Sequence, residues 1–459
     1  MRKAAILTAL LLVLSIGGVC VAASGVYEAR DQVVLTETVV YGDRAAANGL
    51  TVGLNITCAD HLFWDTTCTL DAQIQTRTEY SFSSSEVSKP RPRVYSGISL
   101  DATSGSELAK LELYNSLEPG EEKSAVIYLK DYMDYYPISV SLDLPGITQG
   151  IEGSDVPDWD PNEGTSYYAL LKIRDYFKIP VLEEECYKIS VWKGEGNNGS
   201  YSSRTDFSSE SDHFSMKTFS VPTGDACYFT FDAHTWNGKL VDLHEIPGGY
   251  GIYRLPYQAD EVDADALEMV YPLDPEIKLL GLFSNEDQTR LLLHAVENGK
   301  YILTVIDLDG MTTLQKLEIA EWPEDQGWQL YSGDGCMAVL LSREQELAVI
   351  AETDDGDYEL WYMGDAWPDE LGSFPFRWEP VLTFDGERLA FADFLTNEYG
   401  YYDYYTCDFA LAVYEPSGLA YYGEYGNSLN TGKDASGNHR CRGCYYDPLT
   451  VSWAAEDQN

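Results

Sequence analysis

The 459-residue chain has little positive charge: 30 Lys and Arg stand against 75 Asp and Glu, and the net charge at pH 7 is −45. The phosphate backbone of nucleic acids binds Lys and Arg, so this composition argues against a nucleic-acid partner. It also argues against adsorption to anionic lipid, and favours solubility or attraction to basic surfaces. We therefore expect contact with a membrane only through the N-terminal segment.

Long apolar runs are missing after the first 23 residues. Arg2 and Lys3 precede an uncharged segment over 4–23 that ends in small residues, which is typical of an export leader. Its length also suits a retained membrane anchor, and lipidation at Cys20 is a third alternative. All three predict an extracytoplasmic protein, either secreted or anchored by residues 1–23.

Common catalytic signatures are missing as well. The sequence contains no His-Glu-x-x-His, no Gly-x-Ser-x-Gly and no phosphate-binding glycine loop, so metalloprotease, α/β-hydrolase and nucleotide-dependent activities lose support. The six histidines form no ligand-spaced pair and are expected to be structural. A glycosidase needs only two carboxylates at the right separation in space, and the sequence does not exclude that arrangement.

Short strand patterns dominate the N-terminal part. We expect strands at 33–41, 49–59, 67–76, 93–100, 109–115, 124–129 and 138–144. Each is rich in β-branched or aromatic residues and bounded by turn residues, as in an antiparallel sandwich. The stretch Leu117-Glu118-Pro119-Gly120-Glu121-Glu122 resembles a turn common in bacterial immunoglobulin-like domains. This resemblance implies an immunoglobulin-like β-sandwich over 26–150.

The C-terminal part shows the most regular pattern. A polar, proline-bearing stretch at 155–164 predicts a domain boundary, and a helix is expected at 167–177. Three groups of four strands follow between 277 and 423, joined by turns such as Asn298-Gly299 and Asp309-Gly310. Such dipeptides are strong hairpin signals, because type I′ turns need positive φ at both central residues.

These successive four-strand groups resemble the blades of a β-propeller. The 46 residues from Gly310 to Gly356 are close to the repeat of about 40–45 residues in one class of blade. On architecture alone the chain resembles exported bacterial β-propeller-like proteins with an immunoglobulin-like N-terminal domain. We predict an all-β fold: an N-terminal antiparallel β-sandwich, then a β-propeller-like domain of four-stranded blades over 165–459. A stacked sandwich is the alternative.

Eight cysteines remain when Cys20 in the leader is set aside, an even number that predicts disulfides in an oxidising compartment. We pair Cys58 with Cys68 and Cys186 with Cys227 provisionally, and Cys336 with Cys407 by elimination. The Cys441-x-x-Cys444 motif, preceded by His439, predicts a structural disulfide within the loop or with other cysteines. Redox exchange and metal binding are the alternatives for this motif.

One segment has the spacing of a cation site. Asp158, Asp160 and Asn162 place oxygen ligands two residues apart, as at the start of a calcium loop. Gly164 comes one position late for the turn and Pro161 stiffens the segment, so a solvated linker is the alternative. We expect no cofactor, with calcium as the one candidate. The acidic stretch 260–265 is expected to be an exposed loop.

An aromatic segment at 397–405 supplies the candidate ligand site. Tyr401, Tyr402 and Tyr404 offer apolar ring faces beside carboxylates, a combination that suits sugar rings, although strands also use tyrosine for packing. We expect a non-enzymatic, extracytoplasmic binding protein that presents propeller loops to a protein or glycan at the cell surface. A carbohydrate-active hydrolase on the same scaffold is the alternative.

Overall fold

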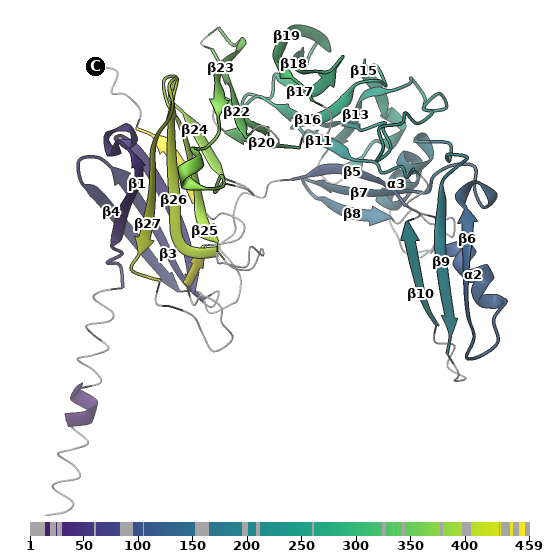
Figure 1. Cartoon of the computed structure of the whole chain (residues 1–459), viewed down its shortest axis with the longest axis horizontal. Helices are drawn as coiled ribbons and strands as arrows, with labels where there is room; N and C mark the ends of the chain where they lie inside the picture. Colours follow the sequence, from purple (N-terminus) through teal and green to yellow (C-terminus); the bar gives the residue numbers. More distant parts are fainter. Residues whose placement is uncertain are drawn as a thin grey trace, which may run out of the picture. The chain divides into compact units, whose positions relative to one another are not determined.

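The computed structural model divides the chain into two compact units, each built mainly from antiparallel sheets (Figure 1). Unit 1 comprises Met1–Pro92 and Asp325–Asn459, and unit 2 comprises Arg93–Glu324. The structure describes residues 14–18, 24, 30–58, 61–82, 95–103, 105–151, 165–194, 201–207, 212–258, 261–323, 327–333, 335–341, 345–353, 355–376, 380–396, 405–430, 432, 441–443 and 449–454.

Two sheets of unit 1 follow the chain as simple meanders. One contains β20 (Trp328–Gly333), β21 (Cys336–Leu341), β22 (Glu346–Glu352) and β23 (Tyr358–Asp365) in that order. A 3-10 turn, η4 (Asp369–Leu371), leads to the second, which contains β24 (Val381–Phe384), β25 (Leu389–Thr396), β26 (Tyr405–Glu415) and β27 (Gly418–Asn427). The N-terminal strand β1 (Leu35–Gly42) adds to the outer edge of the second sheet by pairing with β27.

The third sheet of unit 1 is assembled from both ends of the chain. Its strands are β2 (Leu50–Cys58), β3 (Leu62–Leu70), β4 (Ile74–Phe82), β28 (Cys441–Gly443) and β29 (Leu449–Trp453), and η1 (Arg44–Ala47) leads into it. The C-terminal strands β28 and β29 pair with successive halves of β2. A sheet shared by the two chain ends is typical of propeller-like folds.

Unit 2 contains one regular meander and one branched sheet. The meander is β16 (Lys278–Ser284), β17 (Arg290–Glu297), β18 (Lys300–Asp307) and β19 (Thr312–Glu321). The branched sheet is β11 (Thr218–Pro222), β12 (Ala226–Phe231), β13 (Gly251–Gln258), β14 (Glu261–Val262) and β15 (Glu268–Pro272), with η3 (Ala264–Ala266) between the last two.

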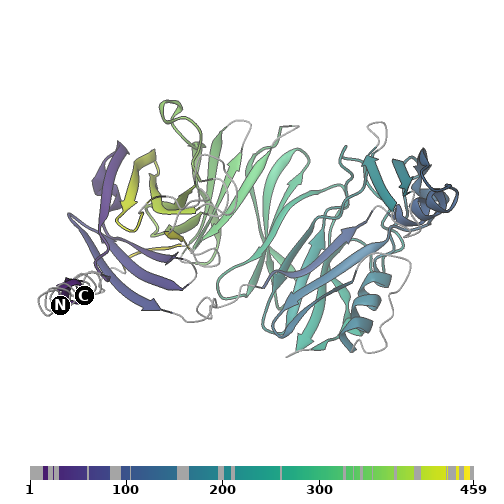
Figure 2. The same cartoon turned by 90° about the horizontal axis from the view of Figure 1, so that it is seen from below.

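Two smaller sheets and two helices complete unit 2. One sheet is β5 (Gly97–Ala102), β7 (Ile138–Leu144) and β8 (Ile147–Ile151), and the other is β6 (Glu122–Tyr128), β9 (Cys186–Lys193) and β10 (Tyr201–Phe207). Helix α2 (Glu107–Asn115) lies beside β9, η2 (Leu129–Asp131) follows β6, and α3 (Thr165–Tyr176) covers β7 and β8 (Figure 2).

The strand order defines a β-propeller-like arrangement, as the sequence predicts. Within unit 1 the first strands β20 and β24 pack together, and within unit 2 β11 packs against both β5 and β16. Successive meanders that meet through their first strands are arranged as propeller blades are. The Asn298-Gly299 turn has positive φ at both residues (52° and 76°), as the type I′ prediction requires.

The N-terminal segment differs from the predicted immunoglobulin-like sandwich. Most of its strands are present, but they are distributed over four sheets, and the first of the two boundaries between the units falls at Pro92/Arg93. The predicted boundary at 155–164 lies outside the described residues, and both of its flanks belong to unit 2. Turn chemistry and apolar alternation identify strands, but they do not specify which strands pair over long range.

The strand predicted at 109–115 is wrong, because this segment lies in helix α2. Its leucines alternate with polar residues, which imitates a strand, but Leu, Glu, Lys and Ala are strong helix formers. Glu107 begins the first turn and pairs with Lys110 one turn later. These local interactions, together with packing beside β9, favour a helix although apolar and polar residues alternate in this segment.

Gly42 at the end of β1 is expected to be essential for pairing with β27. Its φ is +74°, and a Cβ there would overlap the carbonyl oxygen of Ala420. We expect Gly42→Ala to lower the free energy of unfolding by about 2–4 kcal/mol. Gly335→Ala is the matched control, because φ is +69° but the space is open, and we expect it to cost about 1 kcal/mol. Equal losses in urea unfolding would contradict the steric argument.

Candidate functional site

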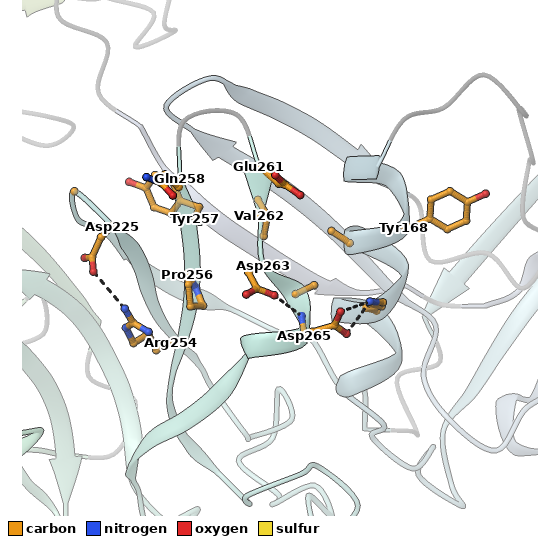
Figure 3. A pocket seen from close by; sticks show the side chains of 14 residues that line it. Tyr168, Asp225, Arg254, Pro256, Tyr257, Gln258, Glu261, Val262, Asp263 and Asp265 are labelled. Carbon is orange, nitrogen blue, oxygen red and sulfur yellow. Dashed lines mark hydrogen bonds and ion pairs between the residues drawn. The ribbon is translucent and has the colours of Figure 1, made fainter.

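A groove of about 1240 Å³ in unit 2 is a candidate site formed by residues that the structure describes (Figure 3). It is lined from three directions: by helix α3, by the end of β13 with the β11–β12 turn, and by the segment 261–265. Its polar lining side chains are Tyr168, Lys172, Asp225, Arg254, Tyr257, Gln258, Glu261, Asp263 and Asp265.

Helix α3 presents its polar face to the groove because its apolar face is buried. Ala169, Leu170 and Ile173 recur at helical spacing and are buried in the core of unit 2. Tyr168 and Lys172 are four residues apart and therefore lie on one face. The Tyr168 side chain is 53% exposed, and in Figure 3 its ring points away from the other labelled lining residues, toward the outer side of α3.

An ion pair fixes the far wall against the helix. Nζ of Lys172 lies 2.7 Å and 2.6 Å from the two carboxylate oxygens of Asp265. Asp263 caps η3, since its Oδ1 accepts hydrogen bonds from the backbone N–H groups of Asp265 (3.2 Å) and Ala266 (3.3 Å). In the described part of the stretch predicted as an exposed loop at 260–265, the acidic residues are exposed as predicted. The segment is not a loop, however, because it forms β14 and η3.

The opposite wall is held by β13 and the preceding turn. Nη2 of Arg254 lies 3.3 Å from Oδ2 of Asp225. The Tyr257 hydroxyl donates to the carbonyl of Thr223. Burial, followed by nearby Cys227 and Asp225, raises the pKa of Tyr257, so the phenol keeps the proton that it donates. This wall is therefore positioned before any ligand binds.

The groove carries more negative than positive groups. Four carboxylates line it, those of Asp225 and of the wall 261–265, against the cations of Lys172 and Arg254. Asp225 pairs with Arg254, Asp263 accepts from the backbone of η3, and Asp265 pairs with Lys172. Gln258 and Glu261 lie at the end of the β13–β14 hairpin (Figure 3). The groove thus offers preformed acceptors, an amide and an aromatic ring, which suits binding of an uncharged polar ligand.

A metal centre is not formed by the residues that the structure describes: no three His, Cys, Asp or Glu side chains among them gather to hold an ion. The predicted calcium ligands Asp158, Asp160 and Asn162 lie outside the described residues, so the calcium site stays a prediction. The same holds for the predicted ligand tyrosines Tyr401, Tyr402 and Tyr404, and for Cys444. Within the described ranges, no helix combines the length and apolarity needed to cross a bilayer.

The predicted pairing of Cys58 with Cys68 is wrong. In the β2–β3 hairpin Cys58 lies opposite Leu62 and Cys68 lies opposite Val52, so the two thiols are at opposite ends of the ladder. At about 3.4 Å per residue this separation is far beyond the reach of a disulfide. Sequence spacing suggested a hairpin correctly, but it did not specify the register.

The other two predicted cysteine pairs are also not joined in the structure. Cys227 lies in β12 and its sulfur is 3.1 Å from the Ser220 hydroxyl, whereas Cys186 begins β9 in a different sheet. Cys336 and Cys407 belong to different core clusters of unit 1. Pairing by elimination fails here because it ignores which sheet each strand joins.

Comparison with known proteins shows distant similarity only. The sequence matches no family model and no curated protein. The β-propeller domain of Cps50 (Swd1) from Myceliophteria thermophila is 8% identical, with 52% of this chain and 70% of that chain covered and a TM-score of 0.26. A protein from Lactobacillus plantarum is 11% identical, with 81% and 94% covered and a TM-score of 0.28.

A third similar structure is a hypothetical selenium-binding protein from Sulfolobus tokodaii, 9% identical, with 83% of this chain and 92% of that chain covered and a TM-score of 0.27. The propeller-like fold of this chain is defined by its own strand order. Its function has to be argued from its own groove.

Proposed function

We propose that this protein is an exported, non-enzymatic binding protein that holds a neutral glycan in the groove of unit 2. The observation that carries the proposal is that an exposed Tyr168 ring, the Gln258 amide and the Glu261 carboxylate all belong to the lining of one groove of about 1240 Å³. Sugar rings pack on aromatic faces while their hydroxyls donate to carboxylates and bond to amides.

Charge favours a neutral ligand over an acidic one. The carboxylates outnumber the cations in the groove, and both cations are engaged by Asp225 and Asp265. An acidic sugar or a phosphate would therefore meet net repulsion. Export is supported by the composition of the first 23 residues, which is typical of a leader.

Binding without catalysis is supported by how the groove carboxylates are used. A glycosidase needs one carboxyl group that gives a proton to the leaving group and a second that acts as nucleophile or base. Oxygens of Asp225, Asp263 and Asp265 are bonded to groups of the protein itself. They position the walls of the groove, which leaves Glu261 as the carboxylate best placed to meet a ligand.

A glycan array with the full chain, followed by titration calorimetry of the bound glycan, tests the proposal. We expect Tyr168→Ala and Gln258→Ala each to weaken affinity by about 5- to 30-fold, the loss of one stacking or hydrogen-bonding contact. Tyr168→Phe keeps the ring and should bind nearly as the parent does. Tyr128→Ala is the control, because this tyrosine is 49% exposed on β6 and does not line the groove.

Three outcomes would contradict the proposal. Failure of every neutral glycan to bind would remove it, as would binding that Tyr168→Ala and Gln258→Ala leave unchanged. In the second case, loss of binding after Tyr401, Tyr402 and Tyr404 are replaced with Ala would assign the ligand to the segment 397–405 instead. Release of reducing sugar during the titration would show a hydrolase.

A further inference from the structure

Cys58 and Cys441 are direct partners on neighbouring antiparallel strands of unit 1. Strand β28 pairs with the end of β2 in the register Cys58↔Cys441, Thr57↔Arg442 and Ile56↔Gly443. Opposite residues in an antiparallel pair have Cα atoms about 4.5–5.5 Å apart, within the range that a disulfide spans. Their side chains also point to the same face of the sheet.

That shared face is the core face of the sheet. Alternate residues along β2 (Leu50, Val52, Leu54 and Ile56) are buried, and Cys58 continues the alternation at the strand end. Cys58 and Cys441 pack in the same core cluster, where Cys441 is 7% exposed and Cys58 is half-buried. The side chains of this directly opposed pair therefore both point to the core face of the sheet.

Strand β28 also packs closely against Phe394 of β25 on this core face. A Cβ at Gly443 would lie 2.5 Å from the ring of Phe394 in β25, so glycine lets β28 approach that sheet closely. The backbone pairing with β2 and the contact with Phe394 together hold Cys441 in place.

Cys407 is the competing partner. It lies in β26, is fully buried in the same core, and interacts electrostatically with Cys441. Burial and the charge of Asp408 raise the pKa of Cys407, which disfavours the thiolate needed for exchange. Cys58, half-buried at a strand end, is the more accessible thiol.

We propose that Cys58 and Cys441 form a disulfide when the exported chain meets an oxidising partner. The oxidant is a disulfide, of an exported thiol oxidoreductase or of oxidised glutathione. The Cys58 thiolate attacks one oxidant sulfur and expels the other as a thiolate. The Cys441 thiolate then attacks the Cys58 sulfur of the mixed disulfide and releases the second oxidant thiolate, so two cysteine thiols are oxidised and one disulfide is reduced.

Such a bond would latch the sheet that the two chain ends share. It would join β2, near the start of the chain, to β28, near its end, and so close a loop over most of the sequence. A cross-link of this length removes much of the conformational freedom of the unfolded chain. The disulfide would hold β28 to β2 covalently, whereas the two strands are otherwise held together by backbone hydrogen bonds.

Mass spectrometry of non-reduced digests tests the connectivity on the full chain, refolded with oxidised glutathione and alkylated before digestion. We expect a peptide pair that joins Cys58 to Cys441 and disappears on reduction. Alkylated Cys58 would overturn the proposal, and so would Cys441 joined to Cys444 or to Cys407.

A stability measurement with matched variants provides the second test. Dithiothreitol should shift the urea midpoint of the parent to lower concentration, and the shift should vanish in Cys58→Ala. Cys68→Ala is the control, because Cys68 is buried at the other end of the same hairpin, and its reductant shift should persist. An equal shift in Cys58→Ala, or none in the parent, would contradict the latch.

Discussion

Replacing Glu185 with alanine is expected to lower the free energy of unfolding by about 3–5 kcal/mol, because a buried hydrogen-bonded network loses its centre. The Glu185 side chain is 0% exposed. The hydroxyls of Tyr136 and Tyr187 donate to its two oxygens, and Nδ1 of His213 lies 3.5 Å from Oε1. Burial and the adjacent carboxylate raise the pKa of both tyrosines, so they remain donors.

The neighbouring residue provides a matched control for Glu185. The Glu184 side chain is 51% exposed and pairs with Lys239 at the surface, so Glu184→Ala should cost at most about 1 kcal/mol. Glu185→Gln should fall between the two, since an amide keeps one acceptor for the tyrosine hydroxyls. Urea unfolding at pH 7 measures all three variants. Equal losses in Glu184→Ala and Glu185→Ala would show that the network contributes little.

Acid is expected to destabilise the β16–β19 sheet through one buried histidine. Burial lowers the pKa of His294 from 6.5 to about 3, and its Nδ1 lies 2.6 Å from the Tyr301 hydroxyl. In the unfolded chain His294 is protonated below about pH 6.5, whereas in the folded protein it stays neutral down to about pH 3. Stability therefore falls as the pH is lowered across this window, by about 3 kcal/mol at pH 4.5.

The double variant His294→Leu/Tyr301→Phe isolates this contribution. It replaces both hydrogen-bonding partners with apolar groups, and it should lose about 3 kcal/mol less than the parent between pH 7 and pH 4.5. Tyr301→Phe alone keeps the buried imidazole and should retain the acid sensitivity of the parent. Urea unfolding at the two pH values measures the difference. The same acid loss in the double variant would contradict the assignment to His294.

Local signals predicted most strands but not their partners. The Asn298-Gly299 turn and the apolar β-branched runs near it specify a hairpin within a few residues, and β17 and β18 form it. Which strands share a sheet depends on contacts far apart in the sequence, such as β1 with β27 and β2 with β29. No spacing rule carries that information, and the cysteine pairs failed for the same reason.

The groove was missed because its parts lie far apart in the sequence. Asp263 before a short helical turn is a capping signal that could have indicated structure in the acidic stretch. Its neighbour Asp265 pairs with Lys172, 93 residues away, and sequence alone does not place these two together. The aromatic-plus-carboxylate chemistry expected at 397–405 recurs in the groove, at Tyr168 and Glu261.

Hydrogen–deuterium exchange with and without a bound neutral glycan tests the central claim most directly, because it locates the ligand without any substitution. We expect slower exchange at the end of β13, through 261–266, and along α3, the elements that line the groove. Exchange in β20–β23 should be unchanged, because those strands belong to unit 1. Protection confined to residues outside the groove would contradict the account.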